Sequence, residues 1–176
     1  MSSSISERLK KEMLRLSNAP GPRDKPSGLG TVRFIAWCAG NANDVLEKAK
    51  SVLMLIDQHG SNGWPNDDEW ERLLPDWFVV KFRPEMSRQE AEAELTRLSR
   101  LSALEQIQEE ETGSWSLSNW IYYFQPSNRH WYWWDGQVLD PDVCVVAVEV
   151  DSWPFPWGSL AWLLRASGAE RVEAEE

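Results

Sequence analysis

The sequence predicts an α+β protein: a largely antiparallel, tryptophan-rich sheet of about five strands, with three main helices packed mostly on one face. Two observations favour this class. Strand and helix patterns are mixed irregularly along 176 residues, a length that suits one domain with its own core. Five of the twelve tryptophans lie in the two aromatic stretches 115–124 and 131–134, and the second stretch runs into a turn dipeptide that is typical of an antiparallel hairpin.

The N-terminal 30 residues are predicted to form a helix and an arm that precede the folded body. Residues 5–16 repeat apolar side chains at helical spacing, which predicts a short amphipathic helix. Residues 18–30 hold three prolines and three glycines and are typical of an extended arm. We therefore expect a helix and arm over 1–30 and a single α+β domain over 31–176.

A central strand and two helices are predicted to follow the arm. Residues 31–38 are apolar, β-branched and aromatic on both faces, as in a strand covered on both sides. Residues 44–58 carry an apolar stripe at helical spacing. Asn66 is a candidate N-cap of a short helix, and Asp67 and Asp68 in its first turn suit the helix dipole.

A second strand and a long helix are expected next. The run WFVVKF, residues 77–82, lies between two prolines and has the composition of a strand. Ser87 and Glu90 match a capping box, which predicts a helix start. Leucines on a drifting stripe extend this helix over 88–107.

Aromatic side chains dominate the following region. Residues 115–124 and the strand that starts at Trp131 would carry aromatic rings on both faces if extended and paired. Asp135 and Gly136 form a turn dipeptide that would end the second of these strands. One aromatic face would cover the helices; the other would be covered by the N-terminal arm or would form a contact surface.

The C-terminal region holds the clearest strand of the chain. Residues 140–150 end in a run, 143–148, that is apolar on both faces and is predicted to lie centrally in the sheet. A last helix is expected over 157–167. Residues 171–176 are predicted as an edge strand or a tail.

Charge and composition limit the classes of function. The net charge is −10; residues 1–30 carry +3, so the remainder carries −13. Such a body disfavours nucleic acid as a partner and favours a basic protein, although the charge would also serve solubility alone. There is neither an apolar run of membrane-spanning length nor a secretory signal, and two cysteines make no disulfide scaffold, so we expect a cytoplasmic protein and no membrane partner.

The sequence holds no standard catalytic or cofactor motif. The two histidines and two cysteines lack the spacing of a metal site, so neither a metal nor a cofactor is predicted. An enzyme acting on a small molecule or carbohydrate is kept as an alternative. It would use His130, Asp135 and Glu149 as acid–base residues in a cleft beside the aromatic sheet.

The sequence favours a non-catalytic protein that binds another protein through an acidic and aromatic surface. The candidate contacts are Trp64, Asp67, Asp68, Trp131 and Trp133, because tryptophans anchor interfaces and carboxylates steer basic partners. Trp64 has a second interpretation, as a ring packed on the short helix it precedes. In its small size, acidity and tryptophan content the chain resembles bacterial immunity proteins, a similarity that implies inhibition of a partner by occlusion. A structural subunit that forms a homodimer is the remaining alternative.

Overall fold

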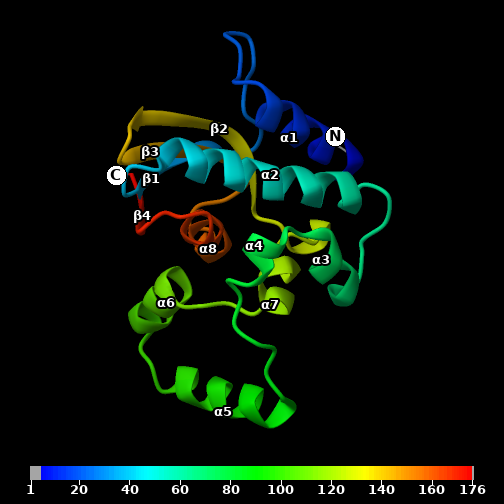
Figure 1. Cartoon of the computed structure of the whole chain (residues 1–176), viewed down its shortest axis with the longest axis vertical. Coiled ribbons are helices and arrows are strands. Elements are labelled where there is room, and N and C mark those ends of the chain that lie inside the picture. Colours follow the sequence, from blue (N-terminus) through cyan, green and yellow to red (C-terminus); the bar gives the residue numbers. More distant parts are fainter. Residues whose placement is uncertain (1–4, 176) are drawn as a thin grey trace.

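The fold is a four-stranded antiparallel sheet combined with helices, as Figure 1 shows for the computed structural model of the chain. The structure describes residues 5–175, apart from the side chains of residues 5 and 110–112. The ends of the predicted segments 1–30 and 171–176, namely residues 1–4 and 176, lie outside the described residues. The described elements are α1 (Ile5–Ser17), β1 (Gly30–Trp37), α2 (Ala42–Gly60), α3 (Asp67–Leu73), α4 (Asp76–Val79), α5 (Arg88–Ser99), α6 (Ala103–Thr112), α7 (Leu117–Tyr122), the 3-10 helix η1 (Pro126–Asn128), β2 (Trp131–Asp140), β3 (Val143–Val150), α8 (Gly158–Ala166) and β4 (Arg171–Ala174).

The strand order is β2-β3-β1-β4, and every neighbouring pair is antiparallel. The predicted central position of 143–148 is confirmed, because β3 pairs with β2 on one side and β1 on the other. The α+β class is therefore confirmed. The predicted number of five strands is wrong for the described residues, which form four strands and eight α-helices.

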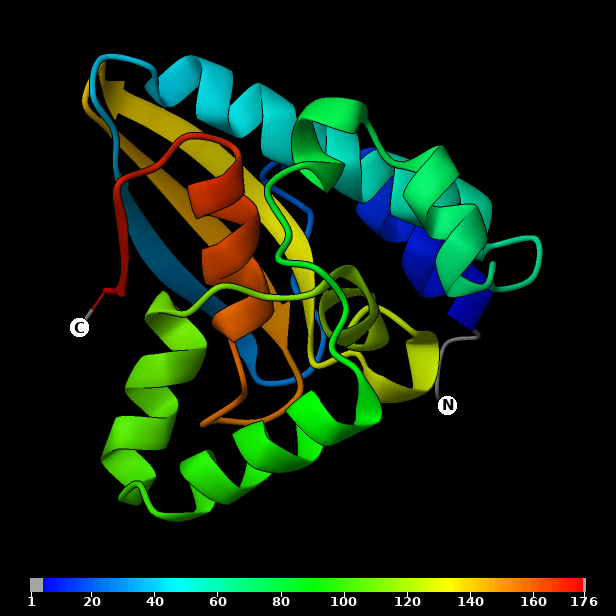
Figure 2. The ribbon, with the colours of Figure 1, turned by 60° about the horizontal axis from the view of Figure 1, so that its bottom comes forward.

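Helices α2 and α8 cover one face of the sheet, on which the side chains of Phe34, Val146 and Trp133 are buried (Figure 2). Both helices were predicted there by their apolar stripes. On its other side α8 meets a layer formed by α3, α4 and α7, where Phe78 and Trp120 are completely buried. The helical hairpin α5–α6 extends away from the sheet (Figure 1), and within the described residues α5 has no buried side chain.

The strand predicted over 77–82 is instead helix α4 and the turn that follows it. Phe78 and Phe82 are four residues apart, so a helical turn brings their rings within 5.0 Å of each other. Both rings then pack against Trp120, at 5.0 Å and 5.7 Å. Tertiary packing of this aromatic pair outweighed the strand propensity of the run.

The strand predicted over 115–124 is also wrong, because its centre is helix α7. The Ser116 hydroxyl accepts a hydrogen bond from the Asn119 backbone N–H, which caps the helix. The helical turn places Trp120 and Phe124 together, with ring centroids 4.2 Å apart. The aromatic residues of this stretch therefore form one buried helical face and one exposed face.

Two further boundaries differ from the prediction. The helix predicted over 88–107 is broken into α5 and α6, because the Ser102 hydroxyl accepts from the Glu105 backbone N–H and starts a new helix. Asp135 and Gly136 lie inside β2 and make no turn. Gly136 instead provides space: a Cβ there would approach the Trp133 ring to 2.6 Å.

The N-terminal helix is part of the folded body. Helix α1 lies along β2, the edge strand of the sheet, where an unpaired strand would expose its backbone donors. The Glu12 carboxylate accepts a hydrogen bond of 3.0 Å from the Trp133 backbone N–H. Arg8 of the same helix lies over the Tyr132 ring at 4.1 Å, so α1 covers the second aromatic face of β2 as well as its edge.

A buried ionic cluster joins α1, α2 and the start of β2. The Arg129 guanidinium donates to the Glu12 carboxylate and, at 3.3 Å, to Asp57 of α2. Burial lowers the pKa of Arg129, but the charges of Glu12 and Asp57 hold that pKa above its usual value. Burial, together with the Glu12 charge, raises the pKa of Asp57 well above its ordinary value of 3.8. Two carboxylates share one cation, so the cluster favours a proton on Asp57.

Asp57→Asn is expected to remove a pH-dependent part of the stability. A carboxyl group whose pKa is raised in the folded state stabilises the fold fully at acidic pH, and this stability is lost as pH rises towards the folded pKa. Relative to Asp57→Asn, the wild-type free energy of unfolding should fall by about 1.4 kcal/mol per pH unit above roughly pH 4. Urea unfolding at several pH values measures this difference. Parallel pH profiles of the two proteins would contradict the raised pKa.

No helix within residues 5–175 has both the length and the apolar character needed to cross a membrane.

Candidate binding surface

Two hollows adjoin at Arg83, on the side of the molecule formed by α3, α4, α7 and the α5–α6 hairpin. We call them the acidic hollow and the aromatic pocket. The acidic hollow has a volume of about 440 Å³, and its polar and aromatic walls include Asp67, Asp68, Glu71, Phe82, Arg83 and Glu85. The aromatic pocket has a volume of about 640 Å³, with walls that include Arg83, Arg97, Trp115, Asn119, Tyr122 and Tyr123.

The acidic hollow is formed where the first turn of α3 faces the segment after α4. The Asn66 side chain accepts from the Glu69 backbone N–H, as predicted, and this cap directs the two following aspartates towards solvent. Glu85 on the opposite wall accepts hydrogen bonds from the backbone N–H and hydroxyl of Ser118. Asp67 and Asp68 form no ion pair with any described residue, so their charges remain available.

The acidic hollow also has apolar walls. Phe82 is half-buried and Leu117 is buried, and both residues line the same cavity as the carboxylates. A lysine or arginine side chain has the same two parts: an apolar stem that gains from contact with hydrocarbon, and a charged end that needs anionic or polar partners. The hollow therefore has the chemistry to receive such a side chain.

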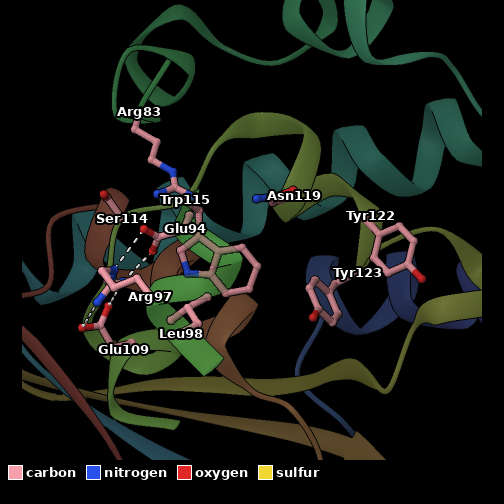
Figure 3. A pocket seen from close by; sticks show the side chains of 11 residues that line it. Arg83, Glu94, Arg97, Leu98, Glu109, Ser114, Trp115, Asn119, Tyr122 and Tyr123 are labelled. Carbon is pink, nitrogen blue, oxygen red and sulfur yellow. Dashed lines mark hydrogen bonds and ion pairs between the residues drawn. The ribbon is translucent and has the colours of Figure 1, made fainter. Parts of the chain in front are cut away.

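The aromatic pocket is built around Trp115, and Figure 3 shows the side chains gathered about its ring. Trp115 and Tyr123 pack edge to face, with centroids 5.5 Å apart. Tyr122 continues the wall, at 5.5 Å from Tyr123, and is 54% exposed. The pocket thus offers an indole and two phenol rings to a ligand at one place.

A charged network closes the far side of this pocket. Arg97 of α5 donates two hydrogen bonds to Glu94, at 2.5 and 3.0 Å, and two to Glu109 of α6, at 3.0 and 3.2 Å. Hydrogen bonds from Arg97 lower the pKa of both carboxyl groups, so both stay ionised. The network ties α5 to α6 and gives the pocket a firm wall.

The predicted tryptophan contacts lie elsewhere. Trp131 and Trp133 are 2% and 1% exposed and face the sheet core, so a partner could touch their rings only after rearrangement of α8 or α2. Trp64 is half-buried and packs on Trp70 of α3, with ring centroids 4.9 Å apart. This contact is the one expected for a ring that packs on the helix it precedes. Of the five predicted contacts, the structure brings Asp67 and Asp68 together in one hollow.

Two residues of the enzyme alternative, Glu149 and Asp135, line different hollows. Glu149 is buried and bound to Lys11 at 3.2 Å and to the Ser27 hydroxyl at 3.0 Å. Asp135 accepts from Gln137 and lines a separate hollow on the sheet face. His130 is exposed just before β2. The acid–base interpretation therefore gains no geometric support and stays a prediction, as does the homodimer.

The two hollows carry carboxylates, a guanidinium and aromatic rings, which are groups that can bind ligands. Among residues 5–175, no three histidine, cysteine or acidic side chains are close enough to hold a metal ion. Comparison with known proteins finds no matching family model, no similar curated protein and no similar solved structure. The function must therefore be inferred from the side chains of these two hollows.

Proposed function

We propose that the protein is a non-catalytic binding protein whose acidic hollow receives a basic segment of a partner protein. The observation that carries the proposal is the unequal charge of the hollow: four carboxylates, from Asp67, Asp68, Glu71 and Glu85, face one guanidinium. Excess negative charge in a concave site raises the local concentration of cationic groups and speeds their association.

The hollow also supplies a place for the rest of a basic side chain. The stem of a partner lysine or arginine would lie on Phe82 and Leu117, and its charge would lie among the three carboxylates of α3. Release of ordered water from the apolar walls would favour the bound state, while the charges would set the association rate. Inhibition of a toxin-like basic partner by occlusion is one concrete form of this function.

The reducing cytoplasm is the compartment proposed for this binding. The thiols of Cys38 and Cys144 lie within reach of each other in the sheet and carry no disulfide. In an oxidising compartment neighbouring thiols tend to be paired.

Asp67→Asn combined with Asp68→Asn is expected to slow association with the partner by about tenfold at low salt, because two steering charges are lost. Asparagine keeps the shape of each side chain at the start of α3. The partner is first captured by cross-linking and affinity purification of the full chain from its native lysate. Association rates of that partner are then measured by surface plasmon resonance at low salt and at about 0.5 M salt, where exposed charges are largely screened.

The matched control is Glu170→Gln combined with Glu173→Gln, which removes the same charge from exposed positions at and beside β4. This control should associate at the wild-type rate. Equal rates for wild type and the Asp67/Asp68 variant would overturn the proposal, and so would an equal loss in the control. Failure to capture any protein would also count against it.

A further inference from the structure

We propose that the aromatic pocket is a binding site for a small planar organic anion, an aromatic ring that carries a single carboxylate. This site is separate from the acidic hollow, although the two adjoin at Arg83. The inference is independent of the proposed protein partner, because Asp67 and Asp68 do not line the aromatic pocket.

Arg83 provides the cation of the site. Its backbone is fixed, because its N–H donates to the Trp115 carbonyl at 3.0 Å and its strand-like bridge pairs it with Ser116. Its side chain is different: among the described residues no hydrogen bond or ion pair engages the guanidinium. The Nε atom is shielded from solvent and has no acceptor among the described residues, so a ligand cannot reach it either. The two Nη atoms are not shielded in this way, and a bound carboxylate would accept hydrogen bonds from both of them.

The other charges of the pocket do not compete for Arg83. Glu94 is the carboxylate whose pKa the Arg83 charge also lowers, but its two oxygens already accept from Arg97. Glu109 is bound to Arg97 in the same way. Carboxylates therefore bind Arg97 on both sides. Among the described residues that line the pocket, Arg83 is the arginine whose guanidinium stays available to an anion from solution.

The rings of the pocket determine the rest of the ligand. Trp115 is half-buried beside Tyr123, and Figure 3 shows its indole at the centre of the group. An aromatic ring that stacks on such a face is stabilised there, as nucleic-acid bases are when they stack on aromatic side chains. The Asn119 side chain forms no hydrogen bond among the described residues, and its amide offers a donor and an acceptor to a ring substituent.

Charge and volume narrow the ligand class. A cavity of about 640 Å³ falls in the range of small-molecule sites, roughly 300–1,000 Å³. Glu94 and Glu109 would repel a polyanion such as a nucleoside triphosphate, while one free guanidinium matches one carboxylate bidentately. The site therefore fits an aromatic monocarboxylate better than a phosphate ester.

Three probes separate the contributions of the ring and the charge. They are 2-naphthoate, its neutral amide 2-naphthamide, and cyclohexanecarboxylate, which has the charge without an aromatic ring. Binding to the full chain is followed by the indole N–H signals in ¹H–¹⁵N NMR spectra, with the Trp115 signal assigned from Trp115→Phe. We expect 2-naphthoate to shift the Trp115 signal saturably, and the other two probes to bind at least about tenfold more weakly.

Arg83→Gln tests the cation directly. This variant should lose at least about tenfold in affinity for 2-naphthoate and keep its weak affinity for 2-naphthamide. Arg88→Gln, a fully exposed position at the start of α5, is the control and should bind as the wild type does. An unmoved Trp115 signal, equal binding of acid and amide to the wild type, or unchanged affinity in Arg83→Gln would each overturn the proposal. The comparison of acid and amide needs no variant, so it decides the case even if Arg83→Gln is unstable.

Discussion

Arg129→Met is expected to lower the free energy of unfolding by about 3–5 kcal/mol at neutral pH, because it removes one partner of a buried ion cluster. Arg129 is completely enclosed, and its guanidinium lies 4.3 Å from the Tyr132 ring centroid and 5.3 Å from that of Phe124. Methionine fills part of this space with an apolar, flexible chain. The larger loss is electrostatic: Glu12 and Asp57 would remain buried with no cation between them.

Two comparisons separate the charge effect from lost packing. The triple variant Arg129→Met, Glu12→Gln, Asp57→Asn carries no charge in the cluster, so it should recover a large part of the stability lost in the single variant. Urea denaturation at pH 7 and at about pH 4 gives the second comparison, since protonation of the Asp57 carboxyl group, whose pKa is raised, should reduce the loss. A single variant as stable as the wild type, or a triple variant no better than the single one, would refute the electrostatic explanation.

The expected result also bears on the N-terminal helix. The Glu12 carboxylate accepts hydrogen bonds from both the Arg129 guanidinium and the backbone N–H of Trp133, so the cluster joins α1 to the edge strand β2. The sequence alone predicts a helix and an arm over 1–30 and leaves open whether they fold onto the body, because prolines and glycines follow the helix. The contacts that fix α1 join residues 117 and 121 positions apart in the chain, and no local pattern indicates such pairs.

Capping patterns within a few residues predict two of the helix starts correctly. Asn66 and Ser87 cap α3 and α5 as predicted. The same pattern occurs at Ser102 and Glu105, where it divides the long predicted helix, and at Ser116, where it begins α7. Both signals are present in the sequence, but the leucine stripe predicts one continuous helix and the aromatic composition predicts a strand, and in the fold the local caps prevail.

The candidate site was predictable in part for the same reason. Asp67 and Asp68 belong to a local pattern, the first turn of a capped helix, and their exposure follows from it. The opposite wall of the acidic hollow and the whole aromatic pocket depend on how α4, α7 and the α5–α6 hairpin pack together. A single backbone bridge brings Arg83 and Trp115 together in the pocket wall. It joins segments about thirty residues apart, and no periodicity of the sequence indicates such a pairing.

Trp120→Ala is expected to lower the free energy of unfolding by about 3–5 kcal/mol, the cost of removing a large ring from a closed core. Trp120 is fully buried, its indole N–H donates to the Ser159 carbonyl at 2.9 Å, and its ring packs on Phe78 and Phe124. Loss of the ring would leave a cavity and an unpaired buried carbonyl between α7 and α8.

Tyr122→Ala, two residues further along α7, is the matched comparison and should cost less than about 1 kcal/mol, because the Tyr122 side chain is 54% exposed. An extended strand over 115–124 would put both residues on the same face, so it predicts similar losses for the two variants. A helix places Trp120 on its buried face and Tyr122 on its exposed face, so it predicts losses of unfolding free energy that differ several-fold. Urea unfolding followed by far-ultraviolet circular dichroism avoids interference from the altered tryptophan signal. Equal losses would support a strand over 115–124 in place of α7, and the aromatic pocket could then not have α7 in its wall.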